Sequence, residues 1–410
     1  MFHSLSRRQF VNVSAGTAAG IGFFQSVPTL FARTAMAAGS PERILVVVQL
    51  SGGNDGLNTV VPFADENYYR NRFTLAIEKE AARRIDDQAG FHPSLDGFAQ
   101  LLESGRLSVV QGVGYPNPNR SHFESMDLWH TAHQAESRIP NGWLGRFLSG
   151  KKGDPSEVPA IHFGAEKQPL ALAAESVTYP SIRSLEQFRL NVGQDAELKK
   201  LIRENLHQER KPADELLSFI QSSADSAIRT GERVEQVLKK KAARAVYPGT
   251  PLANKLKTVS RMIQADMPTR VYYVTLDGFD THANQADAHA GLLSQLGDAV
   301  RAFIEDLVSQ GNDQRVLLFA FSEFGRRVRQ NASQGTDHGT AGPVFLAGGQ
   351  LRPGLFGKQP RLDQLDQGDL KFLIDYRQVY ATILEKWFDV SSSEILGGRF
   401  QTLGLFSSSG

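Results

Sequence analysis

An adjacent Asp–His pair late in the sequence combines two ligand types that suit a divalent metal ion. Asp337 offers a hard carboxylate oxygen and His338 an imidazole nitrogen, a mixture typical of zinc sites. Shortly before the pair lies an unbroken apolar run, Val316 to Ser322, which predicts a buried strand. Because isolated Asp–His pairs are common in solvated loops, the metal hypothesis depends on matching groups elsewhere in the chain.

Three predicted strands, 43–50, 270–276 and 316–322, end close to such groups. In open α/β sheets, ligands bind at the carboxyl ends of the strands. The acidic and imidazole side chains that follow these strands are Asp55, Asp280, His282, Glu323, Asp337 and His338. The carboxylates among them would repel one another at one sheet edge unless some were protonated or a cation neutralised them. The sequence therefore predicts a site for one or two divalent metal ions, most simply zinc, with these residues as ligands.

Ser121 is the candidate nucleophile. It follows a predicted strand at 107–113 and an Asn- and Pro-rich loop, and it opens a predicted helix. A hydroxyl in that position faces the unpaired N–H groups and the positive dipole end of the helix, which suits an anionic ester. Glu124, three residues later, completes a capping box, so a structural role as N-cap explains Ser121 equally well.

Arginines near the predicted site could hold the oxygens of a small anionic ester substrate. Arg120 directly precedes Ser121, while Arg326 and Arg327 follow the predicted strand at 316–322. A guanidinium group can bind phosphate-like oxygens in a bidentate manner. For all three arginines, ordinary surface exposure or ion pairing is the alternative.

Strands and helices alternate along most of the chain. Besides the three strands above, runs at 107–113 and 343–347 predict strands, and amphipathic stretches at 94–105, 287–310 and 375–388 predict helices. This alternation predicts an α/β fold with a doubly wound, mostly parallel sheet and helices on both faces.

Two further regions carry no candidate site residue. Short β-like runs occur at 160–164 and 169–174, and the highly charged region 195–245 predicts surface helices or a cap. We therefore expect a single domain over residues 39–410, with a helical insertion at about 195–265.

The first 38 residues are typical of a twin-arginine signal peptide. Residues 6–10 read SRRQF, a mildly apolar stretch follows over 11–31, and residues 35–37 offer small side chains for cleavage. Pro28 and several Gly, Ser and Thr residues interrupt the apolar stretch, which argues against a stable membrane anchor. We expect a soluble exported protein, most simply periplasmic, whose partner during export is the twin-arginine translocation machinery.

The composition argues against several function classes. The chain contains no cysteine, which rules out disulfides, thiol catalysis and thiolate metal sites. A formal net charge of +1, without a basic stripe, gives no support to a nucleic-acid partner. The glycine-rich turn at 51–56 lacks the spacing of a dinucleotide or phosphate-loop fingerprint.

Several motifs together resemble one known family, the exported domain-of-unknown-function family 1501, over about residues 40–400. In addition to the twin-arginine signal, the motifs are LSGGNDGLNTVVP, VGYPNPNRSHF, GWLGR, GFDTHANQ, SEFGRR and TDHGTA. That family is placed by fold similarity in the alkaline phosphatase and sulfatase superfamily. The resemblance therefore implies an alkaline-phosphatase-like fold.

The superfamily resemblance also implies roles for individual residues. The positions that match its metal ligands and its nucleophile are Asp55, Ser121, Asp280 and His282. Its next strand normally ends directly in Asp–His, whereas here Glu323 ends the strand and Asp337 with His338 follows a loop. Which of these three residues bind metal therefore stays open. The lack of cysteine argues against the usual sulfatase chemistry with a modified residue.

Two function hypotheses follow. The first is an exported metal-dependent hydrolase of phosphate or related esters, in which the metal activates the Ser121 hydroxyl or a water molecule. The second is a non-catalytic binding or secretion-assembly protein on the same fold. The metal content of the exported protein discriminates between them, because only the hydrolase requires a bound ion.

Overall fold

The computed structural model describes residues 42–133, 141–150, 158–164, 166–174, 181–182 and 242–407. The chain divides into two units, Met1–Glu42 and Arg43–Gly410, and every helix and strand named below belongs to the second. The predicted signal peptide and residues 195–241 of the predicted charged helices lie outside the described residues.

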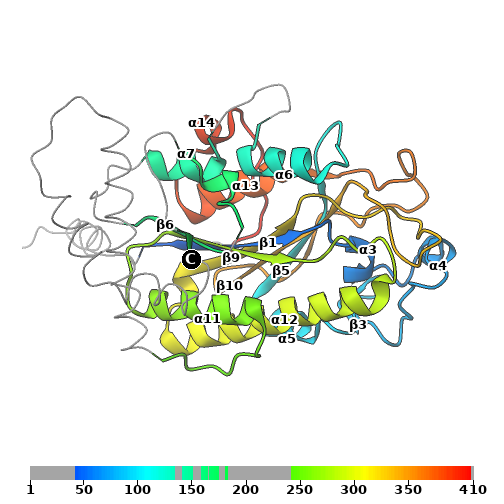
Figure 1. Ribbon diagram of the computed structural model, residues 1–410, viewed down its shortest axis with the longest axis horizontal. Coiled ribbons are helices and arrows are strands. Elements are labelled where there is room, and N and C mark those ends of the chain that lie inside the picture. The colour runs from blue at the N-terminus through cyan, green and yellow to red at the C-terminus, as the bar shows by residue number, and fades with distance from the viewer. Residues whose placement is uncertain are drawn as a thin grey trace, which may run out of the picture. The chain divides into compact units, whose positions relative to one another are not determined.

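A sheet of nine strands forms the centre of the described part of the second unit (Figure 1). The strand order is β11-β5-β10-β9-β1-β8-β6-β7, and β12 pairs with β5 beside β11. The strands are β1 (Ile44–Ser51), β5 (Leu107–Gly114), β6 (Ala160–Phe163), β7 (Ser181–Ile182), β8 (Val271–Asp277), β9 (Val316–Ser322), β10 (Gly342–Gly348), β11 (Gly354–Phe356) and β12 (Ile374–Asp375).

The three strands predicted to meet at one edge lie side by side. β1 is parallel to β8 on one side and to β9 on the other, with Leu50 opposite both Leu276 and Ser322. Only β10 runs antiparallel, to both β9 and β5. β5 is consequently parallel to β9, and its carboxyl end lies at the same edge as those of β1, β8 and β9. The prediction of a mostly parallel α/β sheet is confirmed.

Helices cover both faces of this sheet (Figure 1). On one face lie α5 (Asp96–Glu103), α11 (Pro251–Gln264) and α12 (Gln285–Gln310). On the other lie α6 (His122–Thr131), α7 (Trp143–Ser149), α13 (Tyr376–Thr382) with a π-helical turn (Ile383–Trp387), and α14 (Ser392–Leu396). Alternate residues of β1 enter the two cores: Val46 and Val48 pack with the first helix layer, and Leu45 and Val47 with the second.

Smaller elements complete the described residues. A three-stranded sheet contains β2 (Val60–Val61), β3 (Arg83–Arg84) and β4 (Gly90–Phe91), while α3 (Gly56–Thr59) and α4 (Glu66–Asn71) are short helices. The run at 169–174, predicted as β-like, instead contains a 3-10 turn (Leu170–Leu172). Within the region predicted as an insertion, α11 packs against α12 and β8 as part of the main helix layer.

Candidate functional site

Four loops converge at the edge of the sheet where β1, β5, β8 and β9 end. At their centre is one oxygen atom, Oδ1 of Asp280, in the loop that follows β8. The Nε2 atoms of three histidines surround it, at 3.0 Å for His282, 3.1 Å for His338 and 3.4 Å for His122. The structure thus brings together three of the predicted site residues and adds His122, which was not predicted.

Each of the three imidazole rings is held on its outer side by an oxygen atom. The contacts of the Nδ1 atoms are His122 with Glu323 Oε1 at 2.8 Å, His338 with the Arg120 carbonyl at 2.8 Å, and His282 with Asp337 Oδ1 at 3.4 Å. Nδ1 must carry a proton to donate to these acceptors, so in the neutral form of each ring Nε2 has a lone pair directed at the cluster. Metal-binding histidines are usually held in this way.

The donor atoms also have spacings that suit a metal ion. His282 Nε2 and His338 Nε2 lie 2.9 Å apart. Ligands about 2.0–2.1 Å from a tetrahedral zinc ion are about 3.3 Å from one another. The ligand atoms of His122, Asp280 and His338 all lie within 4.8 Å of one another, which suits a shared ion. His122 Nε2 is buried and has no hydrogen-bond partner among the described residues. Such an orphaned lone pair is costly unless a cation or proton meets it, so the residues present fit a metal ion.

Glu323 lies on the outer side of the cluster and contacts His122. Its carboxylate is buried and accepts hydrogen bonds from the Gly52 amide at 2.9 Å and the Ser322 hydroxyl at 3.0 Å, in addition to contacting His122. The hydrogen bond with Glu323 raises the pKa of His122 above its ordinary value. Glu323 therefore orients an imidazole, and by its position Asp337 does the same for His282.

Arg326 is a buried structural residue. Its guanidinium donates to the carbonyls of Gly52, Gly53, Phe279 and Thr336 and to Asp280 Oδ1, the last at 2.7 Å. Burial alone would raise the pKa of Asp280, but the hydrogen bond and the charge of Arg326 lower it to about 2. Because its donors point at protein groups, the predicted role of Arg326 as a substrate clamp does not fit its position.

The close packing around Arg326 requires glycine at position 52. Gly52 has a φ of +114°, and a Cβ there would lie 2.4 Å from the backbone nitrogen of Asp280. The loops after β1 and β8 therefore touch backbone to backbone beneath the cluster.

Asp55 lies outside the cluster. Its buried carboxylate accepts from Arg72 at 2.5 and 2.9 Å, and from Gln285. Burial alone would raise the pKa of Asp55, but the charge and hydrogen bonds of Arg72 outweigh burial and lower it. Since both oxygens are already bound, the predicted role of Asp55 as a metal ligand does not fit this arrangement.

Ser121 precedes the first residue of α6. It occupies the N-cap position, but its side chain makes no capping hydrogen bond. The capping-box expectation is therefore wrong, because the Glu124 carboxylate bonds to the side chain of Asn119 instead. The guanidinium of Arg120 pairs with Asp369, whereas its backbone carbonyl contacts His338.

His122 is the residue that sequence reasoning missed. It immediately follows the candidate nucleophile, and its ring packs against those of Phe324 and His338, with centroids 4.9 and 4.3 Å away. A single histidine at the start of a helix forms no repeating pattern, so hydrophobic periodicity in the sequence could not identify it. Its only sequence signal is the neighbouring Ser121, at the end of a strand that reaches the same edge.

Comparisons with solved structures give distant similarities. A protein in the alkaline phosphatase superfamily from Vibrio parahaemolyticus is 7% identical, with a TM-score of 0.41, covering 88% of this chain and 70% of that chain. The PsFucS1 sulfatase from Pseudoalteromonas sp. is 10% identical, with a TM-score of 0.40 and coverages of 91% and 72%. The C-terminal periplasmic domain of EcEptC from Escherichia coli, in complex with Zn, is 11% identical, with a TM-score of 0.34 and coverages of 75% and 74%.

Sequence comparison identifies the family. No curated protein matches the chain. Within the described residues, no helix has the length and apolar character needed to cross a membrane. The sequence model of the family described as "Protein of unknown function (DUF1501)" matches residues 42–396, which is most of the chain. This chain therefore belongs to the DUF1501 family.

Proposed function

We propose that this protein is a metal-dependent hydrolase of phosphate or related anionic esters. The observation that carries the proposal is the common orientation of three imidazoles, whose Nε2 atoms face Asp280 Oδ1 while their Nδ1 atoms contact outer oxygens. A purely structural cluster would not require every unprotonated nitrogen to face the same carboxylate. Nitrogen and carboxylate donors in this number favour zinc.

The residues that would hold the ion are His122, Asp280, His282 and His338, with Glu323 and Asp337 behind them. We infer one ion, because Asp55, the further carboxylate predicted for a second, is engaged by Arg72. When bound, zinc would supply a positive charge that polarises an ester oxygen and makes a nearby hydroxyl or water easier to deprotonate.

The chain's own groups prepare this chemistry. Glu323 accepts a hydrogen bond from His122 Nδ1, which leaves Nε2 of the neutral ring available. Asp280 stays ionised because its pKa is about 2, so it keeps its negative charge near neutral pH. Ser121 lies directly before His122 and has no capping bond, so its hydroxyl remains the proposed nucleophile.

The metal itself provides the first prediction. We expect about one zinc ion per chain, by elemental analysis, in the mature protein recovered from the periplasmic fraction of a cell that expresses the full-length chain. Export by the twin-arginine route, which carries folded proteins, is part of this proposal and is motivated by residues 6–10. Metal-free protein in that fraction would contradict the hydrolase, and retention of the chain in the cytoplasm would contradict export.

Ser121→Ala provides the second prediction. Turnover of a phosphate ester such as 4-nitrophenyl phosphate should fall by several orders of magnitude if the hydroxyl attacks the substrate. Stability should change by less than about 0.5 kcal/mol, because the side chain makes no capping bond. Ser94→Ala, at another partly exposed serine, serves as the control and should leave both quantities unchanged. Full activity in Ser121→Ala would assign the attack to a water molecule.

A further inference from the structure

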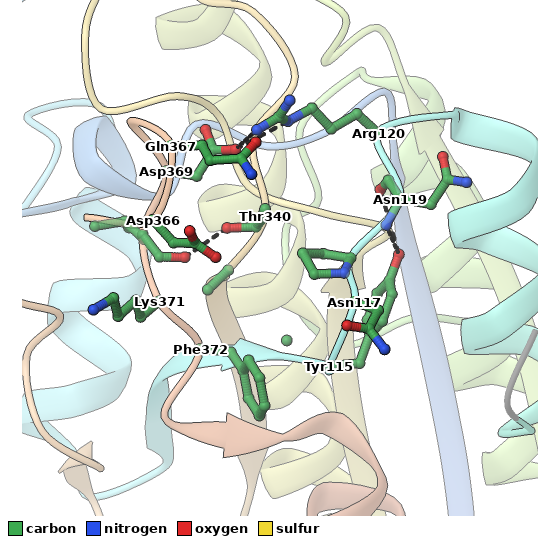
Figure 2. Close-up of a pocket in the computed structure, with 14 residues that line it drawn as sticks. Tyr115, Asn117, Asn119, Arg120, Thr340, Asp366, Gln367, Asp369, Lys371 and Phe372 are labelled. Carbon is green, nitrogen blue, oxygen red and sulfur yellow. Dashed lines mark hydrogen bonds and ion pairs between the residues drawn. The ribbon is translucent and has the colours of Figure 1, made fainter.

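A pocket of about 790 Å³ opens beside the histidine cluster. Its walls come from the loop after β5, from Thr340 and Ala341, and from the segment before β12 (Figure 2). Arg120 connects the pocket with the cluster, because its side chain lines the pocket while its carbonyl accepts a hydrogen bond from His338 Nδ1 at 2.8 Å. The volume lies within the usual range of about 300–1,000 Å³ for small-molecule sites.

The charges in the pocket wall are balanced. Arg120 and Lys371 are opposed by Asp366 and Asp369. Asp369 is 1% exposed and already pairs with Arg120, so this pair offers little net charge to a ligand. Lys371 and Asp366 form no ion pair among the described residues, but they carry opposite charges, so the wall as a whole has no net formal charge. The wall therefore favours a neutral ligand.

Uncharged polar groups and an aromatic ring complete the wall. The amides of Asn117 and Gln367 have no hydrogen-bond partner among the described residues, and each amide can both donate and accept. Both residues have positive φ values, 54° and 51°, so tight turns present them to the pocket. Phe372 lies across the pocket from Gln367 and Asp369 (Figure 2).

We propose that this pocket binds a neutral, hydroxyl-rich ring, such as a sugar, that forms the remote part of the ester substrate. Hydroxyl groups both donate and accept, as the free amides do, and the C–H face of a sugar ring can pack on Phe372. The inference rests on the proposed function for the link to an ester that reacts at the cluster. Binding of the sugar by itself does not depend on ester hydrolysis and requires only the pocket residues.

The test is saturation-transfer NMR on the full-length protein with methyl glycosides as probes, alongside octanoate, which is anionic and apolar. At least one methyl glycoside should bind. Gln367→Gly, which suits the positive φ, and Lys371→Gln should each weaken that binding about fivefold, the effect of one lost hydrogen bond. Lys257→Gln, at an exposed lysine of α11, is the matched control and should leave binding unchanged.

A variant of the cluster separates this inference from the proposed function. His282→Ala should retain glycoside binding while losing ester hydrolysis. Retained binding in a wild-type protein that hydrolyses no ester would contradict the hydrolase and support the pocket. The pocket proposal is overturned if no glycoside binds, if octanoate binds better, or if both pocket variants bind like the Lys257 control.

Discussion

Replacing His282 by Ala is expected to lower kcat/KM for 4-nitrophenyl phosphate by about 10³-fold and to remove most of the bound zinc. The His282 Nε2 atom lies 3.0 Å from Asp280 Oδ1 and 2.9 Å from His338 Nε2, so the variant loses one of four inward donors. A metal ion contributes several kcal/mol to a transition state, and about 4 kcal/mol corresponds to about 10³-fold in rate. Steady-state kinetics and elemental analysis measure the two losses.

Two further variants make this result specific. The His282 side chain is 44% exposed, so its loss should change the free energy of unfolding by less than about 0.5 kcal/mol. His133→Ala, at a partly exposed histidine outside the cluster, should retain zinc and activity. The zinc content and activity of Glu323→Gln should lie between those of His282→Ala and His133→Ala. We expect this variant to lower zinc affinity about 10–100-fold, because Glu323 orients His122. A full zinc content in His282→Ala would contradict the assignment of His282 as a ligand.

Replacing Arg72 by Met is expected to destabilise the protein by about 3–5 kcal/mol. The Arg72 and Asp55 side chains are both fully buried, and the variant leaves the Asp55 carboxylate without its counter-charge. Arg72 also donates to the carbonyls of Arg327 and Val328, so the loop after β9 loses two of its anchors. The midpoint of urea unfolding measures the change.

Arg70→Met is the matched control, because Arg70 forms an exposed ion pair with Glu66 within α4, the short helix that Arg72 directly follows. Exposed pairs are worth at most about 1 kcal/mol, so this variant should unfold close to the wild type. The difference between wild type and Arg72→Met should shrink in acid. The pKa of Asp55 is lowered in the folded protein, so the pair stabilises above the unfolded pKa of about 3.9 and less as pH falls below it. Equal destabilisation by the two arginine variants would contradict the argument.

The sequence predicted the sheet well because its central strands are buried on both faces. Such strands need unbroken apolar runs, and the run at 316–322 coincides with β9. The same reasoning placed Asp280, His282 and His338 at one edge, where the structure brings them together. Periodicity does not specify strand direction, and the antiparallel course of β10 had to come from the structure.

The remaining site residues depend on long-range packing that no local pattern records. His122 reaches the cluster because β5 ends at the same edge as β8, although β9, β1 and β10 separate them in the sheet. Asp55 pairs with an arginine in an irregular segment after α4, which carries no motif. In the sequence, Arg326 resembled a substrate-binding group. Its guanidinium is buried because the surrounding loops contact one another, and no local pattern records that contact.

The loop contacts of Arg326 also affect the thermodynamics of the proposed metal binding. One guanidinium joins the loops after β1, β8 and β9 through bonds to protein groups alone. The conformational entropy of these loops is therefore lost when the chain folds, and little further loss remains for the binding step. The site is therefore preorganised. Replacing Arg326 would weaken binding of the metal ion, because the loops would then lose conformational entropy when the ion binds rather than when the chain folds. A lysine could not substitute, because an ammonium group lacks the planar fork that reaches all three loops at once.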